Sequence, residues 1–204
     1  QTRSILLVLD DVWRAKDGQA FDVLGPRCRM LVTTRDAGIL HALHGEHVPV
    51  SIFTEAESLQ LLADAVSTKE HSVAPADLPD EARAVVAECG CLPLALALSG
   101  GMAKSGHSWQ DIVEALREAD LEWPENREAV NEQHRSIWNA MTASYAMLSA
   151  EEKARFAELS VFPTEGTVPE AAAHVLWQHT ARLSVRHCTK VLINLSERSL
   201  VQLD

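Results

Sequence analysis

The stretch that decides the fold is SILLVLDDVW, residues 4–13. It contains five consecutive apolar residues and then two adjacent acids, Asp10 and Asp11. A continuous apolar run is typical of a strand that is covered on both faces of a parallel sheet. Open α/β sheets bind ligands outside the carboxyl ends of their strands, so the two acids stand where a ligand would bind. A divalent cation at that place would relieve the repulsion between the two carboxylates.

The segment MLVTTRD, residues 30–36, has a second apolar run at its start and polar residues after it. It follows a connection that is long enough to cross over between parallel strands. If the two strands are adjacent and parallel, Thr33, Thr34 and Arg35 reach the same edge as the acids. A guanidinium at this edge suits a γ-phosphate, because it can form two parallel bonds to anionic oxygens. The other interpretation of Arg35 is a surface salt bridge to Asp10 or Asp36, which would carry little meaning.

The pattern of apolar and polar residues divides the chain into regions of different predicted secondary structure. Residues 1–53 are predicted to be α/β, with HVPVSI at 47–52 as a third, weaker strand at an edge. Amphipathic helices with short connections predict an all-α helical domain over 54–122. Polar, aperiodic residues predict a linker over 123–134. Three or four helices and a final strand, SLVQLD, predict a truncated winged-helix domain over 135–204.

Capping boxes mark the predicted starts of three helices. The pairs are Thr54 with Glu57, Ser149 with Glu152, and Thr167 with Glu170.

The composition narrows the range of partners and compartments. The 204 residues carry a net charge of -11, which disfavours a surface that neutralises nucleic-acid phosphates. Four cysteines are too few and too scattered for a disulfide framework, and none has the spacing of a metal finger. No apolar run reaches the roughly 20 residues that span a bilayer. We therefore expect a cytoplasmic protein with reduced thiols and no membrane segment.

Three motifs, in this order, resemble those of the NB-ARC family of signal-transduction ATPases. SILLVLDDVW resembles the Walker B motif, RMLVTTRD the sensor motif, and CGCLPLALAL the G-L-P-L motif. The similarity continues into the C-terminal helices and covers nearly the whole chain. The resemblance implies a P-loop NTPase of the STAND class, an ADP/ATP-binding switch that uses Mg²⁺. Its parent protein would also carry effector and repeat domains, and would self-associate through nucleotide-binding domains in apoptosis- or immunity-like signalling.

The resemblance also implies roles for single residues at the sheet edge. Asp10 would be the acid associated with magnesium, and Asp11 the acid that positions or activates the attacking water. Arg35 would read the γ-phosphate, with Thr33 and Thr34 beside it.

In the G-L-P-L motif, Pro93 would pack near the adenine, although a proline that starts a helix needs no ligand. The motif usually has glycine where this chain has Cys91, with Gly90 before it. If the backbone there requires a positive φ, the cysteine costs energy or the turn shifts by one residue.

A second departure is that these residues contain no G-x-x-x-x-G-K-[ST] phosphate loop. We expect the lysine and amides that cradle the phosphates to lie before Gln1, and the chain alone to bind nucleotide weakly or not at all. Weak ATPase activity is possible only for the parent protein. The first 53 residues are expected to be poorly stable on their own.

Two other functions stay open at this point. One is a DNA-binding regulator of winged-helix type, which would use a locally basic recognition segment over residues 181–198. This segment carries Arg182, Arg186, Lys190 and Arg198, together with His187. The apolar residues of the same segment favour packing into the protein instead. The other is an interaction scaffold whose nucleotide site is inactive.

Overall fold

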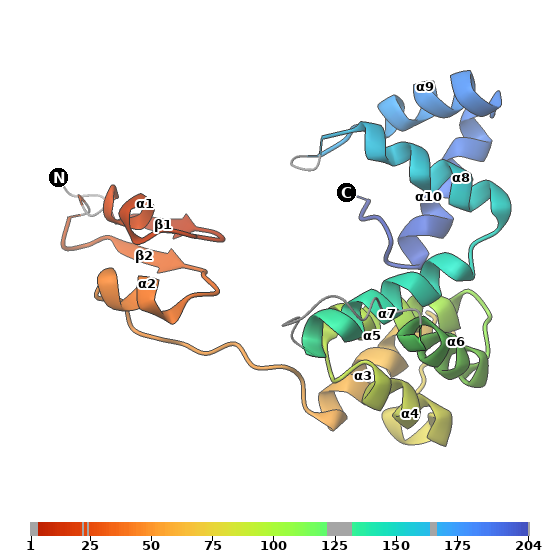
Figure 1. The fold of residues 1–204 in the computed structure, drawn as a ribbon, viewed down its shortest axis with the longest axis horizontal. Helices are drawn as coiled ribbons and strands as arrows, with labels where there is room; N and C mark the ends of the chain where they lie inside the picture. Colours follow the sequence, from red (N-terminus) through yellow and green to blue (C-terminus); the bar gives the residue numbers. More distant parts are fainter. Residues whose placement is uncertain (1–3, 22, 24, 122–131, 164–166, 204) are drawn as a thin grey trace. The chain divides into compact units, whose positions relative to one another are not determined.

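The computed structural model describes residues 4–21, 23, 25–121, 132–163 and 167–203 (Figure 1). The chain forms two compact units, residues 1–51 and 52–204, which are described separately. Over the described residues the chain is mostly helical, with a small parallel sheet near the N-terminus.

The first unit is built on the two predicted strands. Its elements, in chain order, are β1 (Leu6–Leu9), α1 (Ala15–Gln19), β2 (Arg29–Val32) and α2 (Ala37–Ala42). The strands are parallel neighbours, with Leu6 opposite Arg29 and Leu9 opposite Val32. Their parallel pairing is therefore confirmed. The connection that contains α1 supplies the crossover that parallel strands need.

The sheet is covered on one face only, which corrects the expectation of two covered faces. Leu6, Val8 and Leu31 share a face and are 63%, 53% and 54% exposed. Their neighbours along each strand point to the other face and are half-buried. An apolar run makes burial of both faces favourable, but burial needs elements that pack on each face.

The prediction of a third strand over 47–52 is wrong. These residues form no strand, and Val48 and Val50 are 75% and 98% exposed. Pro49 has no N–H to donate to a ladder, and the segment pairs with neither β1 nor β2. The segment is an exposed connection between the two units.

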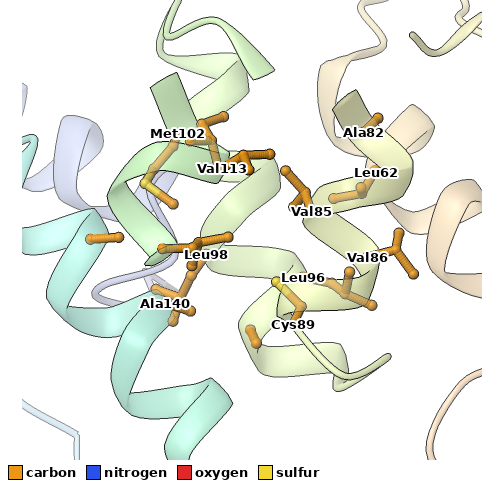
Figure 2. Close-up of a cluster of buried hydrophobic side chains, with 14 of the residues drawn as sticks. Leu62, Ala82, Val85, Val86, Cys89, Leu96, Leu98, Met102, Val113 and Ala140 are labelled. Atoms are coloured by element: carbon orange, nitrogen blue, oxygen red, sulfur yellow. The ribbon is translucent and has the colours of Figure 1, made fainter. Parts of the chain in front are cut away.

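The second unit begins with five packed helices. They are α3 (Glu55–Val66), α4 (Asp80–Glu88) after the short 3₁₀ turn η1 (Pro75–Asp77), α5 (Pro93–Lys104), α6 (Trp109–Leu121) and α7 (Glu132–Ala146). The predicted Thr54–Glu57 capping box starts α3. Figure 2 shows the core of these helices, in which Leu62, Leu98 and Val113 come from α3, α5 and α6.

Three further helices follow α7. They are α8 (Ala150–Glu158) with the 3₁₀ turn η2 (Leu159–Val161), α9 (Glu170–Ala181) and α10 (Val185–Glu197). Their core surrounds Trp177, which is fully buried. The Ser149–Glu152 capping box is confirmed. The Thr167–Glu170 box is wrong, because α9 starts after Pro169 without a side-chain cap.

The end of α10 packs directly on α5. A Cβ atom added to Gly101 would lie 2.7 Å from the Cα of Arg198, so only glycine allows this approach. The Ser199 hydroxyl donates to the carbonyl of Ala97 at 3.3 Å. Leu200 packs against both hydrophobic cores. These contacts hold the last three helices on the first five.

Two predictions about the C-terminal half need correction or fall outside the description. Residues 199–203 form no strand, so the described residues contain no winged-helix hairpin. Leu200 and Val201 pack on helices instead of pairing with another strand. Most of the predicted linker over 123–134 lies outside the described residues, and residues 132–134 open α7.

Candidate functional site

The carboxyl ends of β1 and β2 continue their pairing by a few residues. The N–H of Thr33 donates to the carbonyl of Leu9, and the N–H of Val12 donates to the carbonyl of Thr33, both at 2.9 Å. This register brings the two acids after β1 and the Thr-Thr-Arg residues after β2 to one edge of the sheet. Asp10, Asp11, Thr33, Thr34 and Arg35 therefore lie together, as the sequence predicts.

Thr33 connects the two acids. Its hydroxyl donates to the carboxylate of Asp10 and accepts the backbone N–H of Asp11 at 2.8 Å. Asp11 has a φ of +51°, a left-handed conformation that aspartate tolerates better than most residues. The turn after β1 thus places the two carboxylates in different hydrogen-bonding environments, despite their adjacency in the sequence.

Asp11 has two partners beyond the strand. The Nε1–H of Trp13 donates to one of its carboxylate oxygens at 3.0 Å. The Nε of Arg35 lies 3.7 Å from the other oxygen. The guanidinium of Arg35 also lies over the Trp13 ring, 5.2 Å from its centroid. Arg35 therefore forms its ion pair with Asp11. The alternative interpretation expected Asp10 or Asp36 as the partner of Arg35.

Thr34 and Asp36 form hydrogen bonds with backbone groups of the loops at this edge. The hydroxyl of Thr34 donates to the carbonyl of Val12 at 2.8 Å and accepts the N–H of Asp36 at 3.2 Å. The carboxylate of Asp36 accepts the N–H of Gly38 at 2.8 Å and caps α2. These contacts shape the loop behind Arg35 and leave Thr33 as the threonine that bonds an acid.

The edge is open to solvent and carries an arginine beside two carboxylates. The side chains of Arg35 and Asp11 are 72% and 52% exposed, so a ligand can reach both. No group of three or more His, Cys, Asp or Glu side chains in the described residues could hold a metal alone. Magnesium usually binds through one or two carboxylates, with phosphate and water oxygens completing its shell. Asp10 and Asp11 fit that pattern.

Pro93 belongs to the second unit. It is exposed and occupies the first turn of α5, a position that suits proline because no N–H is needed there. The two residues before Leu92 are both left-handed, with a φ of +58° at Gly90 and +56° at Cys91. The cysteine therefore stands at a position that favours glycine. The carbonyl of Cys91 accepts the N–H of Phe53 at 3.2 Å.

The last helix turns its apolar side into the protein. Cys188, Val191, Leu192 and Leu195 of α10 are buried. Arg198, one of the four basic residues of the DNA-binding alternative, is nearly buried and donates to the carbonyl of Met147 at 3.4 Å. DNA binding through the three remaining basic residues is left as a prediction.

The sequence predicted no role for Trp13, which contacts both Asp11 and Arg35 in the structure. The only signal was an indole two residues after an acid at a strand end. It also gave no reason to distinguish Thr33 from Thr34, since that difference comes from the register of the loops.

In the part of the chain that the structure describes, no helix is both long and apolar enough to cross a membrane.

The chain matches known proteins over most of its length. Residues 1–72 match the NB-ARC domain family. The chain is 30% identical over 176 residues to apoptotic protease-activating factor 1 of Danio rerio, a match that covers 84% of the chain. It is 24% identical over 188 residues to disease resistance RPP8-like protein 3 of Arabidopsis thaliana, which covers 87% of the chain. It is also 28% identical over 179 residues to disease susceptibility protein LOV1 of Arabidopsis thaliana, which covers 80%.

These relatives are much longer than the chain. The aligned part is 13% of the apoptotic factor, 20% of the RPP8-like protein and 19% of LOV1.

Proposed function

We propose that this chain, an NB-ARC protein homologous over most of its length to apoptotic protease-activating factors and plant disease-resistance proteins, is part of an ADP/ATP-operated switch. It is the nucleotide-binding module of a STAND-type signalling protein. Its edge of acids and arginine would read whether the nucleotide carries a γ-phosphate. We place the parent protein in the cytoplasm.

The observation that carries this proposal is the gathering of five polar residues at one sheet edge. Two carboxylates follow β1 directly, and two threonines and an arginine follow β2. Ligands of open α/β sheets bind at this edge. The arginine is highly exposed, so it can turn to an anionic oxygen without leaving a buried site.

Each residue has a distinct part in the proposal. Asp10 would hold the magnesium shell, and the hydroxyl of Thr33 fixes the orientation of its carboxylate. Asp11 would orient water beside the γ-phosphate. Arg35 would accept the γ-phosphate as a partner in place of Asp11. Pro93 would contact the adenine from the second unit.

The magnesium nucleotide, when bound, supplies the γ-phosphate whose presence separates the two states of the switch. A switch requires different contacts in each state, and Arg35 offers such a difference. The domains would be the nucleotide-binding part up to residue 53, the helical part over 54–122 and, beyond the linker, a C-terminal part over 135–204. Release of these parts from one another would allow the parent protein to assemble with further copies. Slow ATP hydrolysis by the parent protein is compatible with the same site.

Replacement of Arg35 by alanine in the parent protein tests the proposal. ATP affinity should fall relative to ADP affinity, because only ATP offers the γ-phosphate. Competition against a fluorescent nucleotide measures both affinities. Arg14→Ala is the matched control, since Arg14 is an exposed arginine of the same unit that pairs with Asp17 at 2.8 Å. An unchanged ATP-to-ADP ratio in Arg35→Ala would refute the sensor role.

A further inference from the structure

We propose that Trp13 is a positioning residue that holds Arg35 against Asp11 and competes with the γ-phosphate for the guanidinium. This inference rests on the proposed function, because it concerns how the same edge distinguishes ATP from ADP. It adds a residue and a mechanism of restraint to that site.

The argument starts from a closed set of three contacts. Trp13 donates to Asp11 at 3.0 Å, Asp11 lies 3.7 Å from Arg35, and Arg35 lies 5.2 Å from the centre of the Trp13 ring. Each residue thus contacts the other two. The indole fixes one carboxylate oxygen of Asp11, and the ring face gives the guanidinium a second attraction beside the other oxygen.

The exposure of Trp13 argues that this contact is more than core packing. Its side chain is 66% exposed, although a tryptophan usually buries most of its large apolar surface. One face of the ring lies against a cation that is itself exposed. Such cation–π contacts are strong enough to bias a side chain and weak enough to be exchanged for a phosphate.

The competition predicts how Trp13 variants change the ratio of ATP affinity to ADP affinity. ATP must draw Arg35 away from both Asp11 and Trp13, whereas ADP leaves it in place. Trp13→Ala removes one of the two competing attractions, so ATP affinity should rise relative to ADP affinity. An exposed cation–π contact corresponds to a change of about two- to five-fold. Trp13→Phe keeps a ring face but loses the N–H, and should lie between Trp13→Ala and the wild type.

The first arm of the test is spectroscopic and needs no nucleotide. In ¹⁵N-labelled samples of this chain, Trp13→Phe identifies the indole N–H signal of Trp13. Arg35→Ala should shift that signal and leave the signal of Trp109 in α6 unchanged. A Trp13 signal that is indifferent to Arg35→Ala would overturn the inference, whatever the parent protein binds.

The second arm measures ATP and ADP affinities of the parent protein in three forms, the wild type, Trp13→Ala and Trp13→Phe. A rise of about two- to five-fold in the ATP-to-ADP ratio for Trp13→Ala, with Trp13→Phe between, supports the inference. An unchanged ratio in a protein that still distinguishes the nucleotides by way of Arg35 overturns it and leaves the proposed function standing. Failure to bind either nucleotide would overturn the proposed function, and the spectroscopic arm would still decide whether Trp13 holds Arg35.

Discussion

The hydroxyl of Thr33 donates a hydrogen bond to the carboxylate of Asp10, a residue 23 positions earlier in the chain. The same oxygen accepts the N–H of Asp11. One side chain at the end of β2 therefore orders the turn at the end of β1. This relationship explains why two adjacent carboxylates at a strand end adopt defined and different orientations.

Thr33→Val should loosen the turn after β1. The substitution keeps the β-branched shape and removes both hydrogen bonds of the hydroxyl, at a cost of about 1 kcal/mol in the stability of the first unit. Exchange of the Asp11 amide proton, followed by NMR, should become faster. Thr33→Ser keeps the hydroxyl and serves as the control. Equal protection of the Asp11 amide in the valine and serine variants would contradict the linking role of Thr33.

Cys91→Gly should stabilise the second unit. Cys91 has a φ of +56°, and the left-handed region costs a residue with a Cβ atom roughly 1–2 kcal/mol. Part of this stabilisation is offset, because a glycine gives the unfolded chain more conformational freedom. We expect the free energy of unfolding to rise by about 0.5–1 kcal/mol. Urea denaturation measures the difference. Cys91→Ala removes the thiol but keeps the Cβ atom, and a gain of equal size in that variant would exclude backbone strain as the cause.

Gly101→Ala should destabilise the second unit, although alanine favours helices by up to about 1 kcal/mol over glycine. The added Cβ atom would lie 2.7 Å from both the Cα of Arg198 and the carbonyl oxygen of Glu197, which are backbone atoms and cannot turn away. We expect a loss of about 1–3 kcal/mol and faster amide exchange at the end of α10. Gly25→Ala is the control, because nothing lies within 4 Å of its added Cβ. A more stable Gly101→Ala protein would show that α5 and α10 are not in close contact.

The junction of α6 and α7 should weaken in acid. Hydrogen bonds from Arg135 lower the pKa of Asp120, burial opposes them, and a bond from Asn139 adds to the lowering. The Arg135 bonds are both 2.5 Å long, and the Asn139 bond is 2.7 Å long. Because the folded pKa lies below the unfolded value, the unfolded chain takes up protons first as the pH falls. The contribution to stability is complete above the unfolded pKa, about 3.9, and is lost through the lowered folded pKa.

Thermal unfolding between pH 3 and pH 7 tests this expectation. Asp120→Asn should be less stable than the wild type at neutral pH, and the difference should shrink as the pH falls. Asp77→Asn changes an exposed carboxylate of η1 and provides the control. A difference between Asp120→Asn and the wild type that is constant with pH would show that the charge of Asp120 does not stabilise this junction.

Local signals in the sequence predicted the start of α3 and the pairing of β1 with β2. Thr54 and Glu57 satisfy each other's backbone partners within one turn of helix, so the signal is complete in four residues. Thr167 and Glu170 have the same spacing, yet α9 begins only after Pro169. The box requires the threonine itself to be the last residue before the helix, and in α9 that place is taken by Pro169.

The arrangement at the sheet edge was predictable only in part. Parallel neighbours bring their carboxyl ends together, which places Asp10 and Arg35 at one edge. The choice of Asp11 as the partner of Arg35, and the place of Trp13 over the guanidinium, depend on loop conformation. Asp11 adopts a left-handed φ, which the spacing of residues in the sequence does not predict. The missing third strand shows the same limit, since Val48 and Val50 have strand propensity but no neighbour to pair with.

The uncovered apolar face of the sheet has a colloidal consequence. Contact between two molecules would bury this face, which is formed by Leu6, Val8 and Leu31, so the face favours association. The net charge of -11 opposes association, because like-charged molecules repel each other. Added salt weakens only the repulsion, because the Debye length shrinks to about 10 Å at 0.1 M. The highest concentration at which the chain stays dispersed should therefore fall as the ionic strength of the buffer rises.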